Sequence, residues 1–353
     1  MNTNFDIPVA VFMFKRIEKT VAIIEQIAKI KPKKIYLIAD GARTASEQNA
    51  VLECRKEVEK NIVWDCEIIK NYSDHNRGVY LNIAGGAKWV FEREEFAIFL
   101  EDDNYPEISF FHFCKEMLEK YKNDTRIFWI CGTNYLKEHE TADGSSYVFT
   151  NHMMPCGWAS WSNKFLKFYD GDLELFDNEI VVSKIKQTYM NKSLFKQDFL
   201  NWQNERKLIK KGIKPSSWDY QMSFSIRANN LLGIVPKYNQ IRNIGVDNDS
   251  AHGGNSFNSI MVSRFCNLET KNLLFPLIHP KTCLVDVKFE DLTGKIICAP
   301  KILNLYHYII DLIIRILQIK DKKSFKSKLR NLVSKVIYFL NFVPKKLYKN
   351  RKK

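Results

Sequence analysis

Three adjacent acidic residues, Glu101, Asp102 and Asp103, follow directly on the apolar run 96–100. An unbroken apolar run predicts a strand buried on both faces, with the three carboxylates at its carboxyl end. Neighbouring carboxylates repel one another and lose hydration in a folded site, and a hard divalent cation relieves both effects. Mg²⁺ or Mn²⁺ typically binds through one or two carboxylates together with a substrate's phosphates. Because a solvated turn would have the same composition, the rest of the chain must decide between the two interpretations.

A second candidate is Asp219, which lies between Trp218 and Tyr220. A carboxylate that is partly desolvated by aromatic neighbours has a raised pKa, as a general base at neutral pH requires. An apolar helical pattern follows at 222–226, so Asp219 is equally compatible with a cap or first-turn position of a helix. The local sequence leaves both roles open.

Two further segments combine glycine with groups that bind ligands. Gly157 and Trp158 precede a second tryptophan, and they predict either ordinary core or a close backbone approach to a sugar with an indole as one wall. His252 lies in the glycine-rich loop 242–255, where a metal or diphosphate role competes with that of a surface histidine. These alternatives also stay open at the level of the sequence.

Strands and helices alternate through the first hundred residues, which predicts an α/β doubly wound sheet. Strands are expected at 8–14, 34–39, 62–69 and 96–101, with helices between them. Such sheets bind ligands at the carboxyl ends of their strands. Arg16, Asp40, Asn76 and Arg77 fall at these ends, as do the acidic residues. The pattern therefore gathers basic, amide and acidic groups at one edge.

Two common nucleotide-binding loops are missing from the chain. No G-x-G-x-x-G follows the first strand, and no G-x-x-x-x-G-K-[ST] occurs anywhere. Dinucleotide oxidoreduction and P-loop phosphoryl transfer are therefore disfavoured. A nucleotide held without these loops needs a metal and side chains such as Arg16 to neutralise its phosphates.

The second half of the chain is less regular. Strands are expected at 126–132, 231–236 and 283–287, a polar loop or hairpin at 133–150, and helices over the site at 163–212. The eight cysteines show no zinc spacing, which favours buried thiols in a reducing compartment. The polar N-terminus shows no signal peptide, so we expect a cytoplasmic protein.

The formal net charge of +14 is concentrated in the tail. Residues 320–353 hold 13 Lys or Arg against one Asp, which leaves the preceding 319 residues at about +2 and argues against a nucleic-acid partner. The tail interleaves these charges with apolar residues, as in basic amphipathic helices at anionic membranes. The alternative is a basic helix that packs on the body or binds RNA.

Taken together, these segments resemble inverting glycosyltransferases of the GT-A fold, specifically bacterial relatives of the N-acetylglucosaminyltransferase I type. The resemblance covers roughly residues 8–260 and depends on the order of six short motifs. It implies that Arg16 meets the diphosphate of a sugar nucleotide and that Asp40 contacts the uracil. It also implies that Asp103 ligates Mn²⁺ or Mg²⁺, within a donor site that includes Glu101 and Asp102.

The resemblance assigns the later motifs as well. Gly157-Trp158 matches the acceptor-side loop, and Trp218-Asp219 matches the dipeptide that supplies the catalytic base. Ala251-His252-Gly253 matches the loop that closes over the diphosphate. Asn76 and Arg77, in the polar loop after the third predicted strand, are expected to contact the donor.

The expected function is metal-dependent transfer of a sugar, with inversion, from a nucleoside-diphosphate sugar such as a UDP-sugar. The acceptor is expected to be a hydroxyl of a glycan or lipid-linked molecule in surface polysaccharide synthesis. Residues 1–132 would bind the nucleotide sugar, residues 133–300 would bind the acceptor, and residues 301–353 would associate with the inner face of the cell membrane.

Two other functions fit part of the pattern. A sugar nucleotidyltransferase has a similar sheet and metal carboxylates, but it usually carries a glycine-rich first loop, which residues 12–16 do not provide. A non-catalytic, membrane-bound carbohydrate-binding protein would account for the tryptophans and the tail without a reaction.

Overall fold

The computed structural model describes residues 5–246 and 260–299. The chain divides into two compact units, Met1–Ile244 with Leu268–Ile297, and Gly245–Asn267 with Cys298–Lys353. The first unit contains an eight-stranded mixed sheet with helices on both faces, which confirms the α/β doubly wound fold class. In the second unit, α9 (Ile260–Phe265) is joined to the later segment by a hydrogen bond from Arg264 Nη2 to the carbonyl of Cys298, 3.1 Å long.

The strand order of the large sheet is β3-β2-β1-β4-β8-β6-β9-β7. The first four strands are parallel, whereas β8 is antiparallel to both of its neighbours. The strands are β1 (Val9–Met13), β2 (Lys34–Ala39), β3 (Glu67–Tyr72), β4 (Phe96–Glu101), β6 (Ile127–Cys131), β7 (Tyr147–Thr150), β8 (Trp158–Trp161) and β9 (Leu232–Pro236). A separate antiparallel pair is formed by β5 (Asn104–Pro106) and β10 (Ile241–Asn243).

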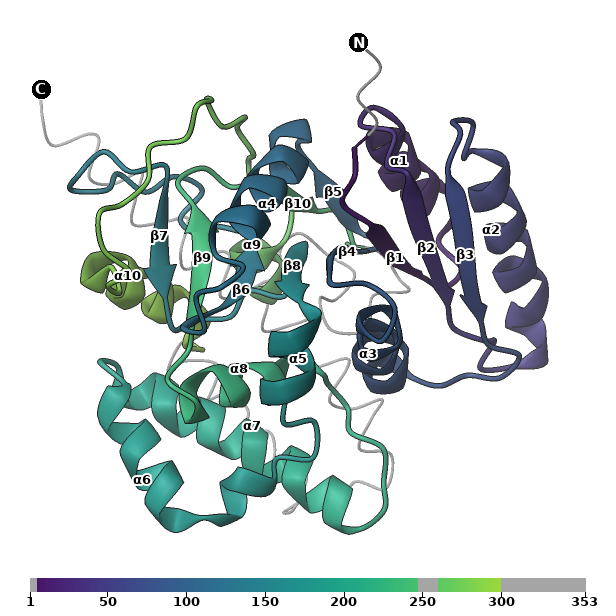
Figure 1. The fold of residues 1–353 in the computed structure, drawn as a ribbon. Helices are drawn as coiled ribbons and strands as arrows, with labels where there is room; N and C mark the ends of the chain where they lie inside the picture. Colours follow the sequence, from purple (N-terminus) through teal and green to yellow (C-terminus); the bar gives the residue numbers. More distant parts are fainter. Residues whose placement is uncertain (1–4, 247–259, 300–353) are drawn as a thin grey trace, which may run out of the picture. The chain divides into compact units, whose positions relative to one another are not determined.

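Helices connect these strands and cover the two faces of the sheet (Figure 1). They are α1 (Ile17–Ala28), α2 (Gln48–Lys60), α3 (Gly86–Phe91), α4 (Ile108–Lys120), α5 (Ser162–Phe168), α6 (Glu179–Thr188), α7 (Lys192–Lys210), α8 (Asp219–Ala228) and α10 (Val287–Ile297). A π-helical turn, Leu81–Gly85, precedes α3, and single 3₁₀ turns occupy Ala45–Glu47 and Glu174–Asp177. None of the helices in these described ranges is long and apolar enough to cross a bilayer.

The alternation of side chains along β1 separates two layers of core. Val9 and Val11 belong to the cluster that α1, α2 and α4 cover, together with apolar residues of β2 and β4. Phe12 points to the other face, where its ring stacks on Phe99 of β4. Since both faces of the central strands are buried, these strands are apolar throughout, which is why they were evident in the sequence.

Three expected elements of the sequence differ from the structure. The third strand lies at Glu67–Tyr72 instead of 62–69, because Ile62 and Trp64 are apolar loop residues that pack on the core before this half-exposed edge strand begins. No strand spans 283–287, where a single bridge joins Val285 to Phe149 and α10 then begins. The segment 133–150, expected to be a loop or hairpin, ends in the edge strand β7.

The expected halves 1–132 and 133–300 are interleaved in the sheet. Strand β8 comes from the second half and lies between β4 and β6 of the first. The assignment of nucleotide-sugar binding to 1–132 and acceptor binding to 133–300 therefore stays a prediction. The tail 301–353 lies outside the described residues.

Gly157 provides a direct test of this packing. Its φ is +63°, and an added Cβ would lie 2.5 Å from the Ile241 side chain. We expect Gly157→Ala to destabilise the protein by about 1 kcal/mol through backbone strain and by a further ~1–3 kcal/mol through overlap with Ile241. Gly144→Ala is the control, because Gly144 has a similar φ of +75° in open space. Urea denaturation measures both, and equal losses would contradict the packing role.

Candidate active site

The carboxyl ends of the parallel strands lie together at one edge of the sheet. In the strand register, Phe12 of β1 is paired with Glu101 of β4, and Met13 is paired with Ala39 of β2. Arg16, Asp40 and the acidic triplet therefore follow neighbouring strands at the same level. The edge predicted from the sequence is present.

Arg16 binds two carboxylates of the triplet. Its side chain reaches them from the N-terminal end of α1, where Nη1 donates to Asp102 Oδ1 at 3.1 Å and to Asp103 Oδ2 at 3.0 Å. The three side chains are each less than one-fifth exposed. A single guanidinium thus offsets part of the negative charge that collects at the end of β4.

The remaining negative charge raises the pKa values of two carboxyls in the cluster. Burial, with Asp103, Asp102 and Asp219 nearby, raises the pKa of Glu101 well above its ordinary value. Burial and Asp103 raise the pKa of Asp102 to about 7, although Arg16 acts in the opposite direction. A cation bound here would lower both pKa values by favouring the ionised forms.

The charge of Asp219 acts on Glu101 although 118 positions separate them in the sequence. Asp219 is the first residue of α8, and its half-buried side chain follows the buried indole of Trp218. That indole packs near the rings of Trp129 and Trp158, which fixes the start of the helix against the sheet. The structure therefore brings the predicted base close enough to Glu101 for its charge to contribute to the raised pKa of that carboxyl.

Two asparagines whose role was not predicted from the sequence hold Asp103. Asn104 Nδ2 donates to Asp103 Oδ1 at 2.7 Å, and Asn243 Nδ2 donates to the same oxygen at 3.3 Å. The amide N–H of Ile244 donates to the backbone carbonyl of Asp103 at 2.8 Å. Asn104 and Asn243 are paired across β5 and β10. Asn104 directly follows the triplet, so its contact with Asp103 could have been predicted from the sequence. Asn243 is distant in the chain, and only the pairing of β5 with β10 brings it to Asp103.

The donor set fits a hard divalent cation that is also bound by phosphate. Mg²⁺ and Mn²⁺ take oxygen ligands, and the protein needs to supply only one or two carboxylates. Asp102 and Asp103 present such oxygens around Arg16 Nη1. Within residues 5–246 and 260–299, no group of three or more His, Cys, Asp or Glu side chains is arranged to hold a metal. The described residues therefore fit a site shared with a ligand better than a closed protein site.

Asp40 folds the loop that follows β3. Its Oδ1 accepts from the backbone N–H groups of Gly41 and Arg77, and its Oδ2 accepts from Asn76 Nδ2 and the N–H of Gly78, at 2.6–3.0 Å. Each oxygen thus already accepts two hydrogen bonds, and the residue is buried. The predicted contact of this carboxylate with a nucleotide base would require one of these bonds to be exchanged.

Asn76 and Arg77 contact Asp40 and its neighbours. Asn76 also donates to the Gly41 carbonyl, and the Arg77 guanidinium donates to the side-chain oxygens of Asn71 and Asn82. Burial lowers the pKa of Arg77. In the described structure, both residues brace the loop between β3 and α3, and their contact with a donor stays a prediction.

The expected role of Trp158 requires a correction. The residue is 1% exposed, and its ring is stacked between Phe99 and Trp129 with centroid distances of 4.0 and 4.2 Å. Its indole is therefore part of the core and offers no wall to a sugar. The close approach that Gly157 permits is to Ile241, and its N–H donates to Asn104 Oδ1 at 2.8 Å. His252 lies outside the described residues.

Comparisons with known proteins give similarity in fold and no family. No family model matches the chain, and no curated protein matches it. UDP-glucose pyrophosphorylase in complex with UDP-glucose is 8% identical over 67% of this chain and 93% of that chain, with a TM-score of 0.33. The synthase of 4-diphosphocytidyl-2C-methyl-D-erythritol from Anaerococcus prevotii is 11% identical over 68% and 92%, with a TM-score of 0.34.

A third solved structure, apo mouse xyloside xylosyltransferase 1, is 8% identical over 78% of this chain and all of that chain. Its TM-score is 0.35. The resemblance to the N-acetylglucosaminyltransferase I type stays a prediction from the sequence.

The side chain of Asn104 connects Asp103 to the residue before β8, so we expect its removal to destabilise the fold at this connection. Asn104→Ala leaves the N–H of Gly157 buried without its acceptor, which costs about 1–3 kcal/mol in the free energy of unfolding. Asn61→Ala is the control, because the one side-chain hydrogen bond of Asn61 goes to the carbonyl of Glu57 at the end of its own helix, α2. Chemical denaturation measures the free energy of unfolding of both variants. An equal loss in Asn104→Ala and Asn61→Ala would contradict the bridging role of Asn104.

Proposed function

We propose that this protein is a metal-dependent glycosyltransferase that transfers a sugar, with inversion, from a nucleoside-diphosphate sugar to an acceptor hydroxyl. The observation that carries the proposal is the joint position of the triplet, Arg16 and Asp219. Two carboxylates share one guanidinium, and the charge of Asp219 acts on Glu101 of the same cluster. The uridine nucleotide is proposed from the sequence resemblance.

The donor would be bound by charge neutralisation. Asp103, assisted by Asp102, would hold an Mn²⁺ or Mg²⁺ ion, whose positive charge would stabilise the departing diphosphate. Arg16 Nη1 donates to both carboxylates, so a phosphate oxygen bound by this guanidinium would replace one of them or accept from another of its nitrogens. Asn104 and Asn243 orient Asp103 through its Oδ1.

The transfer itself requires a base on the acceptor side. Asp219 accepts the proton of the acceptor hydroxyl while the oxygen forms a bond to the anomeric carbon. The bond from that carbon to the diphosphate breaks on the opposite face, and the diphosphate leaves with its electron pair. The half-buried position of Asp219 at the first turn of α8 limits its access to water.

The acceptor and the subcellular location are proposed from the sequence alone. We propose a glycan or lipid-linked acceptor at the inner face of the cell membrane, with the basic tail 301–353 as an anchor. The donor chemistry does not depend on this placement. A sugar nucleotidyltransferase would instead release pyrophosphate from a nucleoside triphosphate, so product analysis separates the two activities.

Asp103 tests the donor site. We expect Asp103→Ala to abolish Mn²⁺-dependent binding of the donor, because the main metal ligand and one partner of Arg16 are lost. Isothermal calorimetry with UDP-sugars, with and without Mn²⁺, measures the affinity. Asp143→Ala is the control, since Asp143 is an acidic residue of a surface loop. An unchanged donor affinity in Asp103→Ala would contradict the metal assignment.

Asp219 tests the chemistry separately from binding. General-base assistance typically contributes about 10²–10⁴-fold, so Asp219→Asn should lose kcat by that factor while donor affinity is retained. Turnover with a donor and acceptor panel measures the loss, and Asp65→Asn on the exposed surface is the control. Full activity in Asp219→Asn would remove this residue from the role.

A further inference from the structure

The α6–α7 pair and the loop after it carry an excess of positive charge. Eight lysines are exposed on this segment, namely Lys184, Lys186, Lys192, Lys196, Lys207, Lys210, Lys211 and Lys214. Among the residues that the structure describes, only Lys210 of these eight forms an ion pair, with Asp177 at 2.8 Å. Since the chain before residue 320 has a net charge of only about +2, this local excess is not a property of the whole body.

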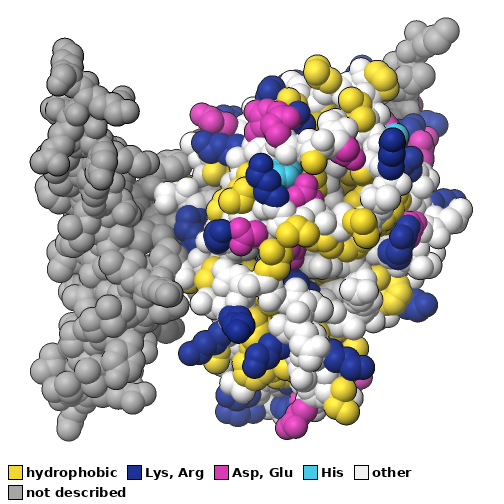
Figure 2. Space-filling model, turned by 90° about the vertical axis from the view of Figure 1, so that its left-hand side faces the viewer, with side chains coloured by type: hydrophobic (Ala, Val, Ile, Leu, Met, Phe, Trp, Pro, Cys, Tyr) yellow, Lys and Arg dark blue, Asp and Glu magenta, His cyan; other side chains and the backbone are white. Residues whose placement is uncertain are grey.

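Large apolar side chains are exposed on the same segment. Ile180, Met190, Leu200 and Ile213 have exposed fractions of 67%, 54%, 45% and 51%. In the lower part of Figure 2, where α6 and α7 lie, basic and hydrophobic side chains alternate on the surface with few acidic ones. Lysine beside exposed aliphatic groups is the composition of surfaces that enter the interface of anionic membranes.

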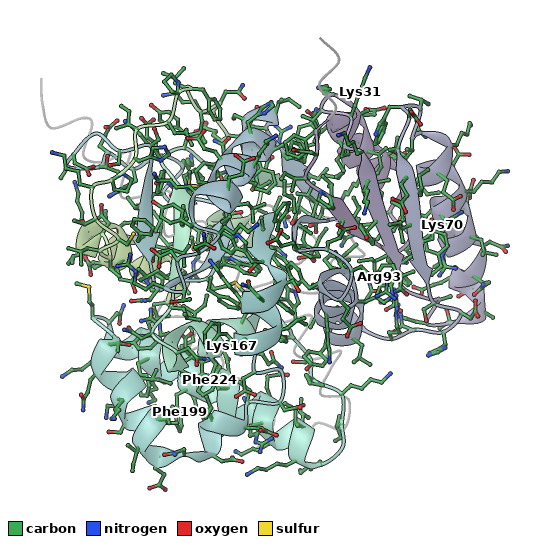
Figure 3. The ribbon with its side chains drawn as sticks, viewed as in Figure 1. Lys31, Lys70, Arg93, Lys167, Phe199 and Phe224 are labelled. Carbon is green, nitrogen blue, oxygen red and sulfur yellow. The ribbon has the colours of Figure 1, made fainter. Side chains whose placement is uncertain are left out.

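The inward face of the segment already has its own core. Phe199 of α7 and Phe224 of α8 lie in one cluster with Phe176, whose ring centroid is 5.4 Å from that of Phe199 and 6.0 Å from that of Phe224. Figure 3 shows both labelled rings between the helices. The four exposed apolar side chains are therefore not needed to hold the helices on the body.

The loop after α7 presents its apolar side chain in a fixed conformation. The N–H groups of Gly212 and Ile213 donate to the carbonyls of Ile209 and Leu208 at 2.9 and 3.0 Å. The N–H of Ser216 donates to the buried carboxylate of Glu205 at 2.8 Å. Ile213 is thus held outward between Lys211 and Lys214, all three exposed.

We propose that α6, α7 and the loop to Lys214 form a contact surface for an anionic lipid bilayer. The lysines bind lipid phosphates, and the exposed aliphatic side chains enter the interface between headgroups and acyl chains. A nucleic acid is the less suitable partner, because an aliphatic side chain between phosphate-binding lysines offers it neither charge nor an aromatic stacking surface. This surface belongs to the folded body and is separate from the basic tail.

The surface also has a consequence for the reaction. Lys214 is five residues before Asp219, so binding of this loop to a membrane would place the predicted base close to the lipid surface. A lipid-linked acceptor would then need little extension to reach the site. This step rests on the proposed function, whereas the membrane surface itself does not.

The first experiment compares two variants of the full chain. Lys211→Glu, Ile213→Ser and Lys214→Glu are combined in one variant, and the matched control combines Lys56→Glu, Val63→Ser and Lys88→Glu, which are also exposed. Both variants retain the tail, and their net charges are equal because each contains two Lys→Glu changes. Co-sedimentation with vesicles of phosphatidylglycerol and phosphatidylcholine in equal parts should show binding weakened at least about tenfold in the first variant relative to the control. Equal binding by the two variants would overturn the proposal.

The second experiment needs no substitution and therefore does not depend on variant folding. Lysine acetylation of the wild-type chain, read by mass spectrometry, should show Lys184, Lys211 and Lys214 protected by these vesicles and Lys56 and Lys88 unprotected. Protection by an RNA oligonucleotide and not by vesicles would overturn the lipid assignment, as would equal protection by pure phosphatidylcholine. Turnover with a soluble acceptor, expected to be unchanged in the loop variant, reports separately on the proposed function.

Discussion

The repulsion among the carboxylates at the end of β4 is the constraint on which the site depends. Glu101, Asp102 and Asp103 are held together because the backbone of β4 and β5 turns there, and burial increases the cost of their charges. Arg16 offsets this cost for two of them. The cluster is consequently prepared for added positive charge, since a cation would relieve an existing unfavourable interaction.

The geometry of the cluster is maintained by neutral groups. Asn104 binds Asp103 with its amide N–H and accepts the backbone N–H of Gly157 with its oxygen, so the triplet is tied to β8. Asn243 approaches from β10 and contacts the same carboxylate oxygen of Asp103. Such hydrogen bonds fix the direction of a carboxylate without adding charge, as the proposed metal-binding role of Asp103 would require.

The predicted membrane surface and the predicted site use charge in opposite ways. The negative groups of the site are concentrated and largely shielded from water, and Asp102 and Asp103 are hydrogen-bonded, so they act at short range on a ligand. The lysines of α6 and α7 are exposed and mostly without ion-pair partners among the described residues, so they act on an extended surface of opposite charge. These two arrangements lie in one folded unit.

The sequence by itself determined the central parallel strands β1, β2 and β4, because strands buried on both faces are almost entirely apolar and their ends are marked by polar residues, whereas the half-exposed edge strand β3 was expected too early in the chain. It therefore placed Arg16 and the triplet at strand ends, and the apolar pattern after Asp219 placed that residue at the start of a helix, whereas their roles in a reaction stay predictions. Only the tertiary structure decided that Trp158 is core, that Asp40 folds a loop, and that Asn104 and Asn243 hold Asp103. The physical reason is that a motif specifies which groups a residue carries, whereas the neighbours that bury or bind those groups come from segments distant in the chain.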